Sequence, residues 1–335
     1  MKLRRTLLVA AAAILGFTTA ASAEVVLKLA MFAPAADPTY KDVVKPWMDE
    51  VNALGKGVLR IDGFPGGALG RDPRMQVKLV NDGVADLAWA VPAYTPGRFT
   101  DTEVMELPGL FNDVKESSLV FRRLYDKRLI GGYDDFFVVL LSTTHPYAIH
   151  TTTPVEKIDD LKGMKLRAGG PVAGAAMRAL GVVPVGMPVT QIAENISKGI
   201  LQGTAAEWNV TYAFRIIDVA KHHFMARLGT VPLGVIMNKK RYESLPKEAK
   251  EILRKTTGET LTKKFGDVHY AIQAKRLEAT KTLAGHKIAY PSSEVEKDWN
   301  TRMKVVVEGW VKRHPKGKVL YEAAVKELAQ IRASQ

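Results

Sequence analysis

The sequence predicts an α/β protein of two lobes, with extended strands that cross between the lobes and a long helix that spans both. Residues 25–91 alternate between short apolar runs and helical patterns, in the β-α-β-α-β order typical of a largely parallel sheet covered by helices. The chain has 335 residues, more than a single hydrophobic core usually supports, so we expect two lobes. One apolar stripe at helical spacing in the C-terminal third predicts the long helix: Leu261, Phe265, Val268 and Ile272.

The first lobe opens with a predicted strand over Val25–Phe32, an apolar run whose only charge is Lys28. Asp37 and Pro38 then form a pair typical of a helix start. The helix that follows contains Pro46, which predicts a kink. This lobe therefore begins as a strand that leads into an irregular helix.

Two further strands are predicted at 58–61 and 86–91, with a helix at about 72–82 between them. In largely parallel sheets, ligands bind outside the carboxyl ends of the strands. The loops after all three strands, at 32–34, 64–66 and 91–94, are therefore predicted binding positions, and the first and third contain Phe32 and Tyr94.

A long extended stretch over 136–153 is predicted to cross to the second lobe. A second alternating set of elements follows it. Its predicted strands and helices are a strand at 165–168, a helix at about 172–180, a strand at 184–185, a helix at about 190–198 and a strand at about 203–208. A buried strand at 232–238 is expected to return to the first lobe, and helices at about 293–313 and 319–331 close the chain. The predicted lobes are 24–148 plus 233–277, and 149–232 plus 278–335.

The N-terminal segment predicts a cleaved signal peptide over residues 1–23. Lys2, Arg4 and Arg5 precede an apolar run that is too short to span a bilayer, and Ala21-Ser22-Ala23 matches the small-x-small cleavage pattern. We therefore expect export to the periplasm, with cleavage after Ala23. The formal charge of the chain is +13, and removal of this segment lowers it to +10.

Composition narrows the possible functions. The chain has no cysteine, which excludes cysteine nucleophiles, zinc–cysteine sites and iron–sulfur clusters. Its basic residues are spread along the sequence rather than clustered, so we expect no nucleic-acid partner. A mild positive field that attracts anionic solutes fits both the charge and the predicted location.

No motif in the chain predicts a catalytic, metal or cofactor site. The glycine-rich stretch 63–70 lacks the Lys-Ser/Thr ending of a phosphate-binding loop and the spacing of a dinucleotide site. His222 and His223 are adjacent, so on a strand they would point to opposite faces. No Gly-x-Ser-x-Gly nucleophile motif is present. We expect a binding protein rather than an enzyme, although distant residues can assemble a catalytic triad without a local motif.

The most informative segment is 160–170, in which a turn leads to a short strand with an arginine near its far end. The guanidinium of Arg167 offers a planar fork for bidentate recognition of a carboxylate. Gly169 and Gly170 follow, allow close approach of the backbone, and open a helix whose N-terminus adds partial positive charge. A surface arginine on an edge strand is the simpler alternative.

This segment resembles the signature of the solute-binding proteins of TRAP (tripartite ATP-independent periplasmic) transporters, the DctP-type family. The resemblance covers roughly residues 25–240. Each matching block alone is weak evidence for the family, whereas the blocks together are specific for it. The other matching blocks are Gly67-Ala68-Leu69-Gly70 with Asn81-Asp82-Gly83 and Asp86-Leu87-Ala88, Glu103 to Pro108, Ala179-Leu180-Gly181, and Gly199-Ile200-Leu201-Gln202-Gly203.

The resemblance implies a periplasmic-binding-protein fold of type II-like architecture, whose lobes close on an organic acid. It also implies delivery of that acid to membrane permease subunits of a TRAP transporter, driven by an ion gradient. Arg167 would bind the ligand carboxylate. The alternative functions are an ABC-type binding protein and a periplasmic enzyme.

The chain departs from the sialic-acid-binding members of the family at several positions. Phe32, Thr153 and Pro232 stand where those members carry polar groups, which argues against a sugar acid because its hydroxyls need partners. The predicted ligand site comprises Arg167, Trp208, Phe32, Tyr94, Tyr147 and Gly169.

Such a site suits a carboxylate with an apolar or aromatic body. A C4-dicarboxylate would need a second cationic or strongly donating group, for which His145, His150 and Arg74 are the candidates.

Overall fold

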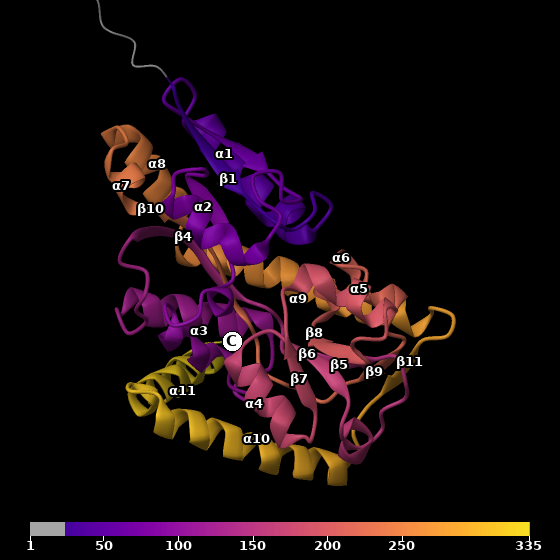
Figure 1. The fold of residues 1–335 in the computed structure, drawn as a ribbon. Helices are drawn as coiled ribbons and strands as arrows, with labels where there is room; N and C mark the ends of the chain where they lie inside the picture. Colours follow the sequence, from indigo (N-terminus) through magenta and orange to yellow (C-terminus); the bar gives the residue numbers. More distant parts are fainter. Residues whose placement is uncertain (1–23, 335) are drawn as a thin grey trace, which may run out of the picture.

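The structure is a computed structural model that describes residues 24–334. The predicted signal peptide at 1–23 lies outside the described residues. Within them, no helix is both long enough and apolar enough to cross a bilayer. Two separate β-sheets, each covered by helices, form the body of the molecule (Figure 1).

The first sheet has five strands. Its order is β2 (Leu59–Phe64), β1 (Val25–Ala30), β3 (Leu87–Ala90), β10 (Pro232–Asn238) and β4 (Phe136–Thr143). β1 pairs in parallel with β2 and β3, as the alternating pattern predicts, and β10 runs antiparallel to both β3 and β4. The carboxyl ends of β1 and β3 therefore lie at the same edge of this sheet.

The second sheet has six strands. Its order is β11 (Lys287–Ala289), β9 (His222–Phe224), β5 (Ala148–Thr151), β8 (Gly203–Ala206), β6 (Lys165–Ala168) and β7 (Val183–Gly186). β6 pairs in parallel with β7 and β8, whereas β5 runs antiparallel to β8 and β9. Strands β9 and β11 were not predicted, since each is only three residues long.

The predicted crossings between the sheets are confirmed. The chain leaves the first sheet at the end of β4 and enters the second at β5 after only four residues, 144–147. It returns between β9 and β10. Both crossings consist of extended, largely buried chain, so the region between the sheets is built from strand ends rather than from long loops.

Eleven α-helices cover the two sheets in the described part of the chain. They are α1 (Lys45–Leu54), α2 (Gln76–Asn81), α3 (Val114–Asp126), α4 (Pro171–Ala179), α5 (Ile192–Ser197), α6 (Trp208–Ala213), α7 (Lys239–Glu243), α8 (Lys247–Thr256), α9 (Glu259–Lys281), α10 (Ser293–Arg313) and α11 (Gly317–Ala333). A π-helical segment at Thr39–Val44 precedes α1. The winding changes to α-helical one residue before Pro46, which has no N–H to donate to the preceding turn.

Helix α9 is the predicted long helix, and it touches elements of both sheets (Figure 1). Near its start, the Thr262 hydroxyl donates to the carbonyl oxygen of Leu141 in β4 at 2.8 Å. Further along, Gln273 Oε1 accepts a hydrogen bond from the backbone N–H of Trp208 in α6 at 2.9 Å. One continuous helix therefore links the two halves of the molecule.

The last two helices pack on different parts of the molecule. α10 lies against α4, which belongs to the second sheet, whereas α11 packs on α3, which covers the first. Leu320 and Ala324 of α11 share an apolar cluster with Phe121 and Leu124 of α3. The predicted lobe boundaries stay a prediction.

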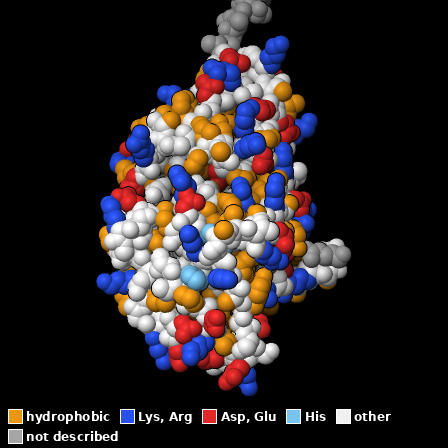
Figure 2. Space-filling view, turned by 90° about the vertical axis from the view of Figure 1, so that its right-hand side faces the viewer, with side chains coloured by type: hydrophobic (Ala, Val, Ile, Leu, Met, Phe, Trp, Pro, Cys, Tyr) orange, Lys and Arg blue, Asp and Glu red, His pale blue; other side chains and the backbone are white. Residues whose placement is uncertain are grey.

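The surface carries charges of both signs. On the face shown in Figure 2, basic and acidic side chains are interspersed rather than gathered into one patch. Many of them form ion pairs between exposed side chains one helical turn apart, such as Lys45 with Asp49 and Lys78 with Asp82. Such pairs contribute little to stability.

Trp47 should be a major determinant of the stability of the first sheet's helical layer. Its side chain is 1 % exposed, and its indole N–H donates to the Thr256 hydroxyl of α8 at 3.3 Å. We expect Trp47→Ala to lower the free energy of unfolding by about 3–5 kcal/mol, because it leaves a cavity. Leu54→Ala at the exposed end of the same helix is the control and should change it by less than about 1 kcal/mol. Equal effects in urea denaturation would contradict this assignment.

Candidate functional site

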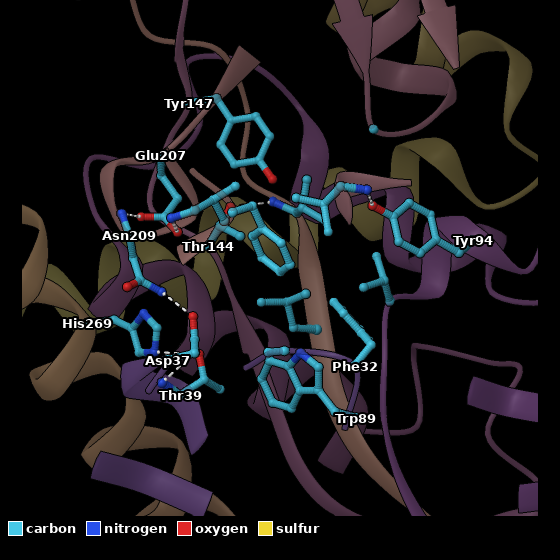
Figure 3. Close-up of a pocket in the computed structure, with 18 of the residues that line it drawn as sticks. Phe32, Asp37, Thr39, Trp89, Tyr94, Thr144, Tyr147, Glu207, Asn209 and His269 are labelled. Atoms are coloured by element: carbon cyan, nitrogen blue, oxygen red, sulfur yellow. Dashed lines mark hydrogen bonds between the residues drawn. The ribbon is translucent and has the colours of Figure 1, made fainter. Parts of the chain in front are cut away.

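A cavity lies between the two sheets, and residues of the loops after β1 and β3, of β6 and of the start of α6 line it (Figure 3). Residues from both sheets and from α9 line it. They are Phe32, Ala33, Asp37, Thr39, Trp89, Val91, Tyr94, Thr144, Tyr147, Arg167, Gly169, Val189, Glu207, Asn209, Val210, Phe214, Val231, Leu233, Phe265 and His269.

Arg167 supplies the positive charge of this cavity. It is the third residue of β6, and it is 2 % exposed. Its Nε donates to the carbonyl oxygen of Met187 at 2.9 Å, and its Nη2 donates to the hydroxyl oxygen of Tyr94 at 2.7 Å. These bonds fix the plane of the guanidinium. Among residues 24–334, no carboxylate forms an ion pair with it, so the charge is left for a ligand.

Gly169 allows the guanidinium to lie flat against the backbone. A Cβ atom at this position would lie only 3.0 Å from Nη1 of Arg167. Because real Cβ contacts are rarely so short, any other residue would push the guanidinium out of place. The glycine after the strand therefore acts by leaving space for Arg167, which refines the predicted role of close backbone approach.

Tyr94 completes the arginine end of the cavity from the first sheet. Its hydroxyl oxygen accepts hydrogen bonds from Nη2 of Arg167 and from the backbone N–H of Val189, the latter at 3.0 Å. Since the oxygen accepts both bonds, its own proton is free to be donated to a ligand oxygen. Tyr94 and Arg167 belong to different sheets, so this contact also joins the two halves.

Aromatic rings form the middle of the cavity. Phe32 and Phe214 approach one another from opposite sides with ring centroids 6.4 Å apart. Trp89 and Phe265 form a second pair at 6.0 Å. Tyr147, which is 6 % exposed, lies above Phe32 and Trp89 in the view of Figure 3. Two pairs of rings and a tyrosine give this part of the cavity a flat, apolar lining that suits an aromatic body.

The other end of the cavity is polar and carries no cation (Figure 3). Asp37 Oδ1 accepts from the backbone N–H of Thr39 at 2.8 Å, and Asp37 Oδ2 accepts from Nδ2 of Asn209 at 3.3 Å. The Thr39 hydroxyl shares a hydrogen bond of 3.2 Å with Nε2 of His269. Burial lowers the pKa of His269 to about 3, so this imidazole is neutral at physiological pH.

Glu207 lines the cavity close to this polar end. Its two carboxylate oxygens accept the backbone N–H groups of Asn209 and Val210 at 2.7 and 3.0 Å, and so they cap helix α6. Burial raises the pKa of Glu207 to about 8, and Asp37 adds a smaller contribution in the same direction. Burial also raises the pKa of Asp37, against the hydrogen bonds from Thr39 and Asn209.

The structure brings together most of the predicted site residues. Arg167, Phe32, Tyr94, Tyr147 and Gly169 all line the cavity. Sequence reasoning missed the polar end: Thr39, Glu207, Asn209 and His269 come from three separate segments, and Asp37 was interpreted only as a helix-start residue. The position of Asp37 just beyond the end of β1 was the one feature of the sequence that could have indicated this polar end.

The prediction of Trp208 as a lining residue is not supported by this geometry. Trp208 is the first residue of α6, and its ring packs edge-on against His150 and His223, with centroids 5.0 and 4.9 Å away. It faces a second cleft, which also contains His145. Asn209, one position later, turns toward the cavity because successive helical residues point in different directions.

None of the candidates for a second cationic group reaches the cavity. Arg74 is paired with Asp72 at 2.7 Å on the surface. His145 lines the second cleft, and His150 is buried with its Nδ1 2.8 Å from Nδ1 of His223. Burial lowers the pKa of both His145 and His150 to about 4, so both are neutral near pH 7. Arg167 is thus the sole permanent cation among the described lining residues.

No metal site accompanies this cavity in the described part of the chain: no three histidine, aspartate or glutamate side chains of residues 24–334 are grouped to hold an ion. The functional groups are instead one guanidinium, one free hydroxyl proton, a set of rings and a carboxylate at the far end. This arrangement can bind a small anion, and it offers no activated nucleophile beside a base.

Comparison with known proteins gives a consistent result. One similar solved structure is a TRAP solute-binding protein from a marine metagenome, which is specific for aromatic acid ligands and is bound to 3-hydroxybenzoate. Its sequence is 30 % identical to this chain, and the match covers 92 % of this chain and 99 % of that one, with a TM-score of 0.86. A TRAP solute-binding protein from Rhodoferax ferrireducens, bound to copurified benzoate, is 26 % identical and covers 93 % of this chain and 100 % of its own, with a TM-score of 0.87.

A sequence relative gives the same assignment at lower coverage. The C4-dicarboxylate-binding periplasmic protein DctP of Rhodobacter capsulatus is 24 % identical over 216 residues, which are 61 % of this chain and 62 % of that protein. The family model described as bacterial extracellular solute-binding protein, family 7, matches residues 29–313. With this match and the shared two-sheet fold, the chain belongs to the DctP family of TRAP solute-binding proteins, which bind solutes in the periplasm and are not enzymes.

Proposed function

We propose that this protein captures an aromatic monocarboxylate and delivers it to the membrane permease subunits of a TRAP transporter. The observation that carries the proposal is the guanidinium of Arg167, which is buried at one end of a cavity lined by aromatic rings and has no counterion among residues 24–334. A buried charge without a partner is costly. A ligand carboxylate would supply that partner.

The body of the ligand is inferred from the rings behind the guanidinium. Phe32 with Phe214 and Trp89 with Phe265 present apolar faces to the space in front of Arg167. Aromatic rings pack best against other aromatic rings in offset or edge-to-face geometry. Two solved relatives with more than a quarter of their residues identical bind 3-hydroxybenzoate and benzoate, which supports the same ligand class here.

A C4-dicarboxylate is disfavoured by the charges of the cavity. Its second carboxylate would lie toward Asp37 and Glu207 and would find no second cation among the described lining residues. An anionic group that is buried without a cationic partner is costly. The proposed ligand therefore carries one carboxylate only.

The two sheets are proposed to belong to two lobes that separate to admit the ligand and close around it. The predicted boundaries place 24–148 with 233–277 and 149–232 with 278–335. Contacts such as Tyr94 with Arg167 join the sheets directly across the cavity. Most of the lining residues are buried, so we infer that these contacts open when the ligand enters.

Glu106 explains why Arg167 remains free for a ligand at neutral pH. The carboxyl oxygens of Glu106 are buried and accept no hydrogen bond from the described residues. Burial raises the pKa of Glu106 to about 8, Glu103 adds to the rise, and Arg167 opposes it. The group is thus largely protonated near pH 7, and its charge does not neutralise the guanidinium.

Replacing Arg167 should abolish capture of the ligand. We expect Arg167→Met to weaken binding of benzoate by at least about 30-fold, since truncating one partner of a buried charge pair typically costs about 2–5 kcal/mol. Isothermal titration calorimetry measures the affinity, and thermal unfolding checks that the variant is folded. Arg178→Met, an exposed arginine on α4, is the matched control. Unchanged binding in Arg167→Met would remove this residue from the site.

Binding should weaken at alkaline pH because Glu106 ionises. Above about pH 8 its negative charge would compete with the ligand for Arg167, whereas the ligand carboxylate is ionised throughout. We expect affinity for benzoate to fall on the order of threefold to tenfold between pH 6.5 and 9.5 in the native protein. Glu106→Gln should reduce that fall, with a remaining slope from Glu207, whose pKa also lies at about 8.

Glu308→Gln, on the exposed face of α10, is the control for the pH series and should follow the native profile. A Glu106→Gln profile that superimposes on the native one would exclude Glu106 as the titrating group.

Export with cleavage after Ala23 is the remaining part of the proposal. Mass spectrometry of the protein from a periplasmic extract should give a mature chain that begins at Glu24, because the small residues Ala21 and Ala23 fit the cleavage pattern. Retention of residues 1–23 on a membrane-bound protein would show that the segment is an anchor instead.

A further inference from the structure

The second cleft, which Trp208 faces, lies behind the cavity that contains Arg167. Tyr147 and Glu207 line both spaces and therefore stand between them. The cleft is also lined by 145–148 and 225–227, which belong to the two crossings between the sheets, and by α9. Its volume is about 690 Å³, within the range of small-molecule sites.

Two buried side chains of this cleft have hydrogen-bond donors without partners. Trp208 is 4 % exposed and Gln273 is 5 % exposed. Neither Nε1 of Trp208 nor Nε2 of Gln273 has a hydrogen-bond partner among the described residues. The amide of Gln273 cannot be turned over, because its Oε1 accepts the backbone N–H of Trp208 at 2.9 Å. Both nitrogen atoms can only donate, so an acceptor is expected from a bound molecule.

Arg227 supplies a positive charge at the rim of the same cleft. Its Nη1 donates to Oδ1 of Asn112 at 3.0 Å, and no carboxylate of residues 24–334 forms an ion pair with it. It is the only lysine or arginine among the described residues that line the cleft. Of the two acidic lining residues, Glu207 uses both oxygens to cap α6, and Glu296 lies on the exposed edge. The cleft therefore favours an anion that accepts hydrogen bonds.

Aromatic rings provide the apolar part of the lining. Phe111 and Trp299 are buried, whereas Tyr270 is 48 % exposed and Tyr290 is 60 % exposed. The indole N–H of Trp299 donates to the carbonyl oxygen of Arg227 at 2.9 Å and so ties this wall to the cation. Rings that line a cleft in this way are suited to cover a flat apolar body.

We propose that the second cleft is a further binding site for an organic acid whose apolar body is larger than a single ring. Oxygen atoms of this molecule accept hydrogen bonds from Trp208 and Gln273, and the charge of Arg227 balances its carboxylate. The size of the body follows from the volume of the cleft and the number of rings around it. This site does not use Arg167, so it is independent of the proposed function.

The test locates a two-ring acid, naphthalene-2-carboxylate, by ¹⁹F NMR on the mature chain labelled with 5-fluorotryptophan. The chain has five tryptophans, each assigned by its own Trp→Phe variant. Trp89 lines the cavity, Trp208 and Trp299 line the second cleft, and Trp310 lines another surface pocket. We expect saturable shifts of the Trp208 and Trp299 resonances, both in the native protein and in Arg167→Met.

Gln273→Met removes one of the two donors and keeps a side chain of similar length. It should weaken binding of naphthalene-2-carboxylate by about tenfold, as expected for the loss of a hydrogen bond to a charged group. Gln330→Met, at an exposed position of α11, is the matched control and should keep the native affinity. Arg227→Met should weaken binding by about twofold to fivefold, because an exposed charge contributes less.

Thermal unfolding checks that each variant is folded, and Arg227→Met tests the site even if Gln273→Met is unstable. If the Trp208 and Trp299 resonances do not shift, or if their shifts are lost in Arg167→Met, the inference is overturned. Shifts confined to Trp310 would place the acid in the other pocket and have the same consequence. Unchanged affinity in both Gln273→Met and Arg227→Met would also overturn it.

The result is separate from the test of the proposed function. A protein that binds naphthalene-2-carboxylate in the second cleft but binds no benzoate in the cavity would overturn the proposed function and leave this inference standing. The reverse result would overturn only this inference.

Discussion

A single buried guanidinium without a counterion is the constraint around which the centre of this protein is arranged. Arg167 lies at the junction of the two sheets, and its Nε and Nη2 are held by Met187 and Tyr94. Gly169 leaves the space in which the group lies flat. The neighbouring carboxyl, Glu106, is buried so deeply that its protonated form is favoured. Each of these features keeps the positive charge in place without neutralising it.

The chemical character of the cavity lining changes from the end at Arg167 to the opposite end. One end offers a cation and a hydroxyl proton, the middle offers rings, and the far end offers carboxylate and amide oxygens. Such a gradient selects a molecule by orientation as well as by size, because a reversed ligand would place its anion at the end that offers no cation among the described lining residues.

Much of the fold was predictable because it depends on local pattern. The strand at 165–168, the crossing between sheets and the long helix α9 were confirmed, since apolar runs and helical stripes depend on nearby residues. The five predicted residues that line the cavity were identified mainly by resemblance and by their position at strand ends. Trp208 was misplaced because a one-residue shift at a helix start turns a side chain away from the cavity.

The polar end was not predictable from sequence, because its members meet only in three dimensions. Asp37 and Asn209 are separated by 172 residues, and each belongs to a different sheet's loops. No spacing rule connects them. The cluster of His150, His223 and His286 was unpredictable for the same reason: His150 and His223 pack on Trp208, and His286 packs on His223.

Two hydrogen bonds join the sheets at opposite ends of the cavity, Tyr94 with Arg167 and Asp37 with Asn209. These two hydrogen bonds lie at opposite ends of the cavity in which the ligand is proposed to bind. A rotation of one sheet about either bond would therefore stretch the other bond. Release then requires both to break in the same opening event. Dissociation would therefore behave as a cooperative step, with little population of half-open forms.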